Sequence, residues 1–145
     1  MALKVLLPVD RARNSIRAEE YALVFHRKTP LEVTLLTVIN ESILTDRGIS
    51  PNLVEQLKQG QRDHAARVLA EAVKPFKEAG IPVEQRIEYG LPGPTICHIA
   101  AEENFDLVLI TEAGLTEGGQ IRRGSVVDAV THACRVPVTL VKHSL

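Results

Sequence analysis

The residue types between positions 114 and 125 suit the binding of an anion. Four glycines and two arginines lead up to a serine here: Gly114, Gly118, Gly119, Arg122, Arg123, Gly124 and Ser125. Glycines let the backbone turn its N–H groups toward a ligand, and a helix that begins near Ser125 would add the positive end of its dipole. The segment therefore predicts a phosphate-binding loop.

The same residues also have purely structural interpretations. Ser125 and Asp128 match the S-x-x-D capping signature, so the serine could simply cap its own helix. The glycine pair could provide flexibility, and Arg122 and Arg123 could be solvated surface charges. Capping does not exclude contact with a phosphate, so both interpretations stay open.

Motifs for better-defined chemistry are incomplete. Gly114-x4-Gly119 resembles the start of a Walker A loop, but Gln120 and Ile121 stand where Lys and Ser or Thr are required. The G-x-G-x-x-G dinucleotide fingerprint and the G-x-S-x-G nucleophile elbow are both absent. No catalytic residue set is therefore predicted.

The cysteines and histidines lack the spacing of a metal site. Cys97 and His98 are adjacent, and neither C-x2-C nor H-x3-H occurs around His132 and Cys134. We interpret these residues as buried thiols and surface histidines. Two cysteines are too few for a disulfide framework and predict a reducing compartment.

Composition excludes several classes of function. The chain has 145 residues, and 17 Lys+Arg against 18 Asp+Glu give a net charge of −1, which excludes broad electrostatic capture of nucleic acid or membrane. Aromatic residues make up only 3%, too few for a base-stacking platform. The apolar run 5–9 ends at Asp10, too early for a signal peptide, and no run approaches the ~20 apolar residues of a membrane span. We expect one soluble, cytoplasmic domain over residues 1–145.

Strand and helix patterns alternate along the chain. Short apolar runs predict buried parallel strands, and apolar residues at helical spacing predict helices between them. The expected strands are 5–9, 35–39, 83–89, 107–110 and 138–141, and the expected helices are 18–25, 65–76, 94–100 and 125–134. Pro94 would take the first position of helix 94–100, and Pro75 would kink helix 65–76. Residues 40–52 would form a long loop. This order predicts a doubly wound α/β domain with strand 83–89 at an edge.

Ligands of such sheets bind beyond the carboxyl ends of the strands, where the strand order reverses. Segments 10–14, 40–42, 90–93 and 111–125 can reach that edge. Asp10 could contact a ligand there or cap its loop, although Asn14 and Ser15 are better placed as helix caps.

Several segments together resemble the universal stress protein family across essentially the whole chain. They are Leu6-Leu7-Pro8-Val9-Asp10, Leu35-Leu36-Thr37-Val38, Gly114-x9-Gly124-Ser125-Val126 and Arg135-Val136-Pro137-Val138. The resemblance implies a single domain with a five-stranded parallel sheet in order 3-2-1-4-5 and helices on both faces. The reversal would then fall between the strands that end at Asp10 and Thr111.

Nucleotide-binding members of that family carry G-x2-G-x9-G-[ST] and hold ATP. The resemblance implies that Asp10 contacts the ribose, that Pro8, Val9 and Val38 flank the adenine or bond it through their backbone, and that the glycine segment holds the phosphates. The residues implied for the phosphate end are Thr111, Gly114, Arg123, Gly124, Ser125 and Val126. The expected cofactor is ATP, with AMP or another adenine nucleotide as the alternative, and with Mg or Mn bound through the phosphates.

This sequence departs from the family pattern at the first glycine, where Thr111 stands. The β-branched side chain adds bulk, and Glu112 adds negative charge near the expected phosphates, which predicts weakened or altered nucleotide binding. The leading hypothesis is an adenine-nucleotide-binding stress-response protein. A dimeric interaction module without nucleotide affinity is the alternative, and a slow nucleotide hydrolase is the third hypothesis.

The last strand is expected to mediate self-association. Relatives in the family dimerise through this strand, and an apolar sheet edge over 136–141 would pair with its own copy across a two-fold axis. Pro137 cannot donate a hydrogen bond, so the pairing of the homodimer should be centred near Leu140.

Overall fold

A five-stranded parallel sheet forms the centre of the computed structural model, which describes residues 1–10, 12–44, 48–115 and 121–142. The strands are β1 (Leu3–Pro8), β2 (Leu31–Ile39), β3 (Val83–Tyr89), β4 (Leu107–Thr111) and β7 (Val138–Val141). They lie in the order β3-β2-β1-β4-β7. The predicted order 3-2-1-4-5 is therefore confirmed, with β7 as the fifth strand, and β3 is the predicted edge.

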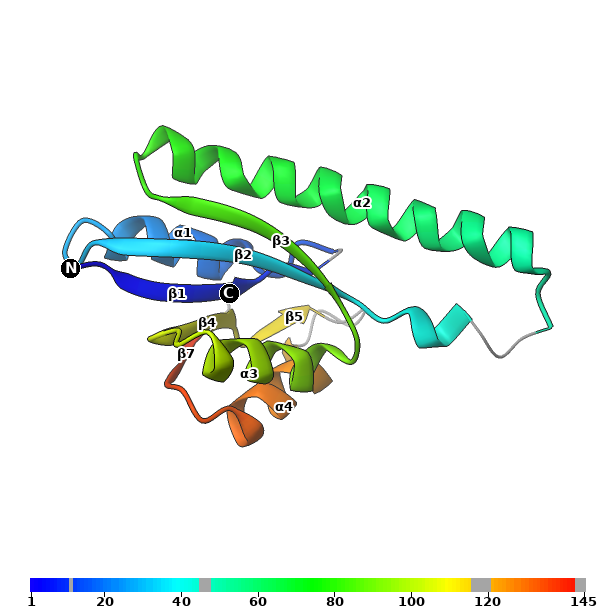
Figure 1. Cartoon of the computed structure of the whole chain (residues 1–145). Coiled ribbons are helices and arrows are strands. Elements are labelled where there is room, and N and C mark those ends of the chain that lie inside the picture. The colour runs from blue at the N-terminus through cyan, green and yellow to red at the C-terminus, as the bar shows by residue number, and fades with distance from the viewer. Residues whose placement is uncertain (11, 45–47, 116–120, 143–145) are drawn as a thin grey trace.

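Two helices cover each face of the sheet (Figure 1). They are α1 (Ile16–Phe25) and α2 (Pro51–Glu78) on one face, and α3 (Pro92–Glu102) and α4 (Ser125–Ala133) on the other. Successive side chains of a strand point to opposite faces, so Val5 and Leu7 pack under α1 and α2 while Leu6 packs under α3 and α4. The continuous apolar run of β1 is thus buried on both sides.

Helix α2 begins earlier than its apolar pattern indicates. Ser50 caps it by accepting a hydrogen bond from the Leu53 N–H at 3.3 Å, and Pro51 takes the first helical position. None of the described residues 51–64 is buried, so this half carries no amphipathic signal, and it extends beyond the sheet (Figure 1). The predicted loop 40–52 is accordingly shorter and includes a short 3-10 helix, η1 (Glu41–Leu44).

Two further expectations about element boundaries are wrong. Helix α3 begins at Pro92, so Pro92 rather than Pro94 occupies its first position. The segment expected as a plain glycine loop contains two short antiparallel strands, β5 (Ala113–Leu115) and β6 (Ile121–Arg123). Helix α2 continues through Pro75 to Glu78, and the kink there stays a prediction.

The two cysteines form a disulfide, so the interpretation as free thiols is wrong. Cys97 lies on α3 and Cys134 caps the C-terminus of α4, with their Cα atoms 4.7 Å apart. Their separation of 37 positions hides the pairing in the sequence, because it depends on how α3 and α4 pack side by side. Within the described parts of the chain, no helix is long and apolar enough to cross a membrane.

Candidate functional site

A cavity of about 330 Å³ lies at the carboxyl ends of β1, β2 and β4, against the starts of α3 and α4. Its lining residues are Pro8, Val9, Asp10, Asn14, Ser15, Leu36, Thr37, Val38, Pro92, Ile96, Ile110, Thr111, Gly124, Ser125, Val126 and Val127. This is the side of the sheet where the strand order reverses, between β1 and β4.

The cavity brings together most of the residues that the sequence pointed to. Pro8, Val9, Asp10, Val38, Thr111, Gly124, Ser125 and Val126 all line it. The backbones of Gly114 and Arg123 lie in the short strands β5 and β6. Gly118 and Gly119 fall outside the described residues.

The residues that sequence reasoning missed are mainly apolar: Leu36, Pro92, Ile96, Ile110 and Val127, together with the polar Asn14, Ser15 and Thr37. A signal for some of them was available. Leu36 and Val38 are two apart on one strand, and Pro92 and Ile96 are four apart on one helix, so each pair shares a face. What the sequence lacked was the register that turns those faces toward the cavity.

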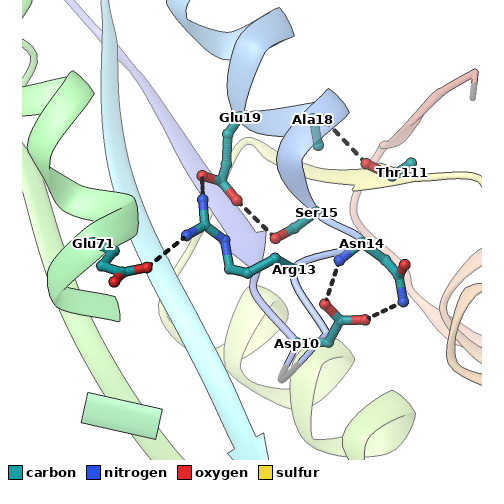
Figure 2. A network of polar contacts seen from close by, with 8 residues as sticks. All are labelled: Asp10, Arg13, Asn14, Ser15, Ala18, Glu19, Glu71 and Thr111. Carbon is teal, nitrogen blue, oxygen red and sulfur yellow. Dashed lines mark hydrogen bonds and ion pairs between the residues drawn. The ribbon is translucent and has the colours of Figure 1, made fainter. Parts of the chain in front are cut away.

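Asp10 closes the loop between β1 and α1. Its Oδ1 accepts a hydrogen bond from the Asn14 N–H at 2.7 Å, and its Oδ2 accepts one from Asn14 Nδ2 at 2.8 Å (Figure 2). The capping interpretation of Asp10 is therefore confirmed. An ionised carboxylate offers about four acceptor positions, so two of them are not used by Asn14.

A partly buried ion pair anchors this loop to both helices of its face. Arg13, at φ 58°, donates from Nη2 to Glu19 Oε1 at 2.8 Å, and its Nη1 lies 3.8 Å from Glu71 Oε2 on α2. Ser15 Oγ donates to the other oxygen of Glu19 at 2.8 Å (Figure 2). Glu19 is only 5% exposed, so its charge depends on these partners.

Thr111 caps helix α1 from a neighbouring strand. Its Oγ1 accepts a hydrogen bond from the Ala18 N–H at 3.0 Å, in a buried position at the end of β4 (Figure 2). Ser15 occupies the N-cap position of α1 but makes no side-chain cap bond, because its hydroxyl is directed to Glu19. The expected position of Ser15 at the start of α1 is therefore confirmed, but the side-chain cap bond comes from a residue distant in sequence.

Glu112 is paired rather than free to repel an anion. Lys142 Nζ donates to Glu112 Oε1 at 2.9 Å, and the Glu112 N–H donates to the Val141 carbonyl at 2.8 Å. Glu112 does not appear among the cavity-lining residues. Its charge is thus compensated at the edge of the sheet, which reduces the electrostatic penalty that the sequence suggested.

The N-terminus of α4 opens onto the cavity without a side-chain cap. Gly124 is the N-cap, and Ser125 is the first helical residue, so the prediction that Ser125 caps the helix is wrong by one position. Gly124 has no side chain with which to cap the helix. The N–H groups of the first helical residues have no acceptor within the helix and suit an anion.

The backbone at the carboxyl end of β2 lines the cavity together with the start of α4. The Val33 N–H and the Ile39 carbonyl bond toward β3, whereas the Leu36 carbonyl accepts from the Val9 N–H at 2.7 Å on the β1 side. Even-numbered residues of β2 therefore direct their backbone groups toward β1. Because β1 ends at Pro8, the described residues offer the N–H and C=O of Val38 no backbone partner.

Thr37 secures this arrangement at the ends of the strands. Its Oγ1 donates to the Val9 carbonyl at 2.9 Å in a buried position. The Val9 carbonyl, which would otherwise accept a hydrogen bond from the Val38 N–H and continue the β1–β2 ladder, is therefore already used.

No cluster of three or more His, Cys, Asp or Glu that could hold a metal occurs in the described parts of the chain.

Comparison with known proteins gives the same family along the whole chain. A model of the universal stress protein family matches residues 1–142. The universal stress protein MJ0577 of Methanocaldococcus jannaschii is 27% identical over 155 residues, covering 98% of this chain and 96% of that protein. A solved structure of MJ0577 has a TM-score of 0.84 and covers 100% of this chain and 99% of its own.

Two more distant structures share the fold and contain nucleotides. A universal stress protein in complex with cAMP has a TM-score of 0.71 at 23% identity and covers 98% of each chain. A protein of the same family from Arabidopsis thaliana with AMP bound has a TM-score of 0.69 at 19% identity, covering 98% of this chain and 92% of its own. With the sheet order described above, the full-length family match shows that this chain belongs to the universal stress protein family.

Proposed function

We propose that this protein binds an adenine nucleotide in the cavity between β1 and β4, in a stress-response or regulatory role. ATP is the expected ligand, with AMP as the alternative. The observation that carries the proposal is one cavity that contains both the backbone edge at Val38, which has no backbone partner among the described residues, and the start of α4 at Ser125, whose N-cap residue Gly124 has no side chain. The cAMP and AMP complexes of proteins with this fold support it.

The Val38 edge matches adenine rather than guanine. A backbone N–H beside a C=O complements the N1 acceptor and the N6 amino donor of adenine. Guanine presents the reverse pattern at the same positions, so it would leave buried polar groups unpaired. Leu36, Ile96 and Ile110 supply apolar walls for a flat base.

The sugar and phosphates fit the polar end of the cavity. The two acceptor positions of the Asp10 carboxylate that Asn14 does not use suit ribose hydroxyls. The N–H groups of Ser125 and Val126 suit phosphate oxygens, in the field of the α4 dipole. Mg or Mn would then be held by the phosphates rather than by a cluster of protein ligands. Gly114 and Arg123 stay predictions for this end.

Isothermal titration with ATP, AMP and GTP tests the proposal. We expect ATP or AMP to bind at least about tenfold more tightly than GTP, because GTP would leave the Val38 groups unpaired. At a ligand concentration of one hundred times Kd, the stability should rise by about 2.7 kcal/mol, which is roughly 5–10 °C in Tm. Absence of heat and of a Tm shift with millimolar ATP, Mg or Mn included, would contradict the proposal.

A dimeric interaction module without nucleotide affinity is the second candidate. Thr111 favours it, because this side chain fills a position that is glycine in the nucleotide-binding motif and is committed to α1. Mass spectrometry of ligands released from the freshly purified protein separates the two candidates. A bound adenine nucleotide supports the first, and an empty protein that also fails to titrate supports the second.

We also propose that the protein forms a homodimer through β7 and acts in the cytoplasm. β7 is an edge of the sheet, and its residues are only partly buried in one chain. The carbonyls of Val141 and of Pro137, just before β7, accept hydrogen bonds from the N–H groups of Glu112, just after β4, and Val108. The alternate residues Val138 and Leu140 therefore direct their backbone groups outward. That pattern suits antiparallel pairing with a second copy.

A further inference from the structure

The disulfide joins the two helices that form one wall of the cavity. Cys97 follows the cavity-lining Ile96 on α3, and Cys134 ends α4, whose first residues also line the cavity. These are the only two cysteines in the chain. The covalent bond therefore connects the wall that carries Pro92 and Ile96 to the helix that begins at Ser125.

Helix α4 has little stability of its own. It spans nine residues, fewer than the roughly 12–15 that an isolated helix needs, and Gly124 at its N-cap provides no side-chain bond. Its position depends on its contacts with the sheet and with α3. The cavity end of α4 is thus sensitive to how firmly the two helices are joined.

Two close contacts fix α4 against α3. A Cβ atom placed on Gly93 would lie 2.5 Å from the Ala129 Cβ, so the helix surfaces touch at that point. One turn further along α3, Cys97 bonds to Cys134. Without the disulfide, the C-terminal end of α4 would keep only non-covalent packing.

The disulfide lies beside a hollow that a small reagent can enter. The hollow has a volume of about 260 Å³ and is lined by Cys97, His98, Ala101, Glu102, Ala133 and Arg135. Both cysteines are only partly buried, and the exposed Arg135 directly follows Cys134. Cys97 lines this hollow, so its sulfur is the one that a small thiolate can reach, and access is one of the factors that set the rate of thiol exchange.

We propose that Cys97 and Cys134 form a reversible thiol–disulfide site that controls how firmly α4 closes the cavity. The redox partner is a low-molecular-weight thiol and its disulfide, such as glutathione. The effect on nucleotide affinity rests on the proposed function; the effect on α4 does not. In the predicted cytoplasmic location, disulfides are characteristically transient and redox-sensing.

The exchange balances as two consecutive thiolate attacks. The first small thiol loses its proton, attacks Cys97 Sγ and breaks the Sγ–Sγ bond, so Cys134 leaves as a thiolate and takes up a proton. The second small thiol loses its proton and attacks the sulfur of the first in the mixed disulfide. Cys97 leaves and is protonated, and the two small thiols depart as one disulfide. The protein disulfide is thus reduced by two electrons, and the two small thiols are oxidised by the same two electrons.

Hydrogen exchange of the whole protein in oxidised and reduced glutathione tests the clamp on α4. Iodoacetamide labelling and intact mass define the states, with two labels on the reduced protein and none on the oxidised protein. We expect amides of α4 to exchange at least about fivefold faster after reduction, while amides of β1 and β2 are unchanged. Titration with ATP should show affinity about threefold to tenfold lower in the reduced state, because the wall is less preorganised.

The double variant Cys97→Ser/Cys134→Ser is the matched control. Its α4 exchange and ATP affinity should equal those of the reduced protein in both oxidised and reduced glutathione. If this variant fails to fold, the comparison of oxidised with reduced wild-type protein is the test. Equal α4 exchange in the two wild-type states, or a disulfide that millimolar glutathione cannot reduce, overturns the inference. Equal ATP affinity with unequal exchange overturns its regulatory part. If neither state binds nucleotide while α4 exchange still differs, the proposed function fails and the thiol–disulfide clamp stands.

Discussion

Thr111 has two roles that substitutions can separate. Its hydroxyl caps Ala18, and its bulk occupies the cavity where the nucleotide-binding motif has glycine. We expect Thr111→Gly to enlarge the phosphate end and tighten ATP binding, but to lower stability by about 1–2 kcal/mol through loss of the cap. Thr111→Ser should keep the acceptor and most of the stability. Urea unfolding and calorimetric titration of both variants measure the two effects.

The outcome for Thr111→Ser decides how this residue acts on ligand affinity. If only bulk weakens binding, the serine variant should bind ATP more tightly than wild type with little change in unfolding free energy. Poorer binding in Thr111→Gly, with binding in Thr111→Ser at least as tight as in wild type, would mean that the position of α1, set through Ala18, matters more than the space beside Thr111.

Arg13 is expected to be a large single contributor to the stability of the loop beneath the cavity. It holds φ 58° and pairs with Glu19, which is buried. Arg13→Ala should lower the unfolding free energy by about 2–3 kcal/mol, because the buried carboxylate of Glu19 is left without its cation. This loss is smaller than for a fully buried pair, since Arg13 is partly exposed. Adding Glu19→Gln to that variant should recover part of the loss, and a strictly additive double mutant would contradict this coupling.

At the scale of elements, the start of α4 offers a test of phosphate contact. Proline is favoured at the first helical position, and Gly124 before it has extended backbone at ψ 158°, so Ser125→Pro should preserve the helix. It removes one N–H that faces the proposed phosphates. We expect ATP affinity to fall about fivefold to thirtyfold, the equivalent of one charge-assisted hydrogen bond.

Ser125→Ala is the control for that variant, because it removes the hydroxyl and keeps the backbone N–H. Its affinity should fall less than that of Ser125→Pro. Equal losses would assign the contact to the hydroxyl, and unchanged binding in both would remove α4 from the nucleotide site. Melting curves of the two apo proteins check that the helix is retained.

The link between β3 and α3 predicts a dependence of stability on acid. Arg86 on β3 donates to Glu103 at 2.6 Å, and this hydrogen bond is the main cause that lowers the pKa of Glu103 below its ordinary value of 4.5. A lowered folded pKa adds stability above pH 4.5, and that stability is lost as the pH falls through the folded pKa. Since both side chains are substantially exposed, we expect a few tenths to about 1 kcal/mol.

Urea midpoints measured between pH 6 and pH 3 should therefore decline less steeply in Glu103→Gln than in wild type. Glu102→Gln, one residue earlier on the exposed surface of α3, is the control and should follow the wild-type curve. Parallel curves for wild type and Glu103→Gln would assign the acid response to other carboxylates.

How much of the structure the sequence could predict depends on the range of the interactions involved. The apolar runs at 5–9 and 35–39 reflect burial on both faces of a strand, so the parallel sheet was predictable from local pattern. The first half of α2 was missed because none of its described residues is buried, and β5 and β6 were missed because three-residue strands carry no periodicity.

The site was predictable in its location but not in its internal bonds. Asp10 lies just after the end of β1 and Thr111 ends the neighbouring β4, so the reversal of strand order places them together. The cap from Thr111 to Ala18 spans 93 residues, and the unpaired edge of Val38 follows only from the register of β1 and β2. The disulfide likewise depends on the packing of α3 against α4, which no spacing in the sequence records.

At the scale of the whole molecule, the open edge of β7 sets the expected assembly. Leu140 directs its backbone groups away from β4, so it lies where a second copy could add a strand. Leu140→Lys places a charge in that interface and should give a monomer at tens of micromolar protein, measured by light scattering. Because the cavity-lining residues belong to one chain, ATP affinity should stay within about twofold of wild type, as for distant, independent sites.

Two companion variants make the assembly test specific. Leu57→Lys adds the same charge at an exposed apolar position on the outer half of α2 and should leave the dimer intact. Leu140→Pro removes the outward N–H while keeping the backbone bonds that the odd-numbered residues of β7 make to β4, so it should also yield a folded monomer. A wild-type protein that scatters as a monomer would refute pairing through β7. So would folded Leu140 variants that remain dimeric, since each then retains an interface that does not use this edge.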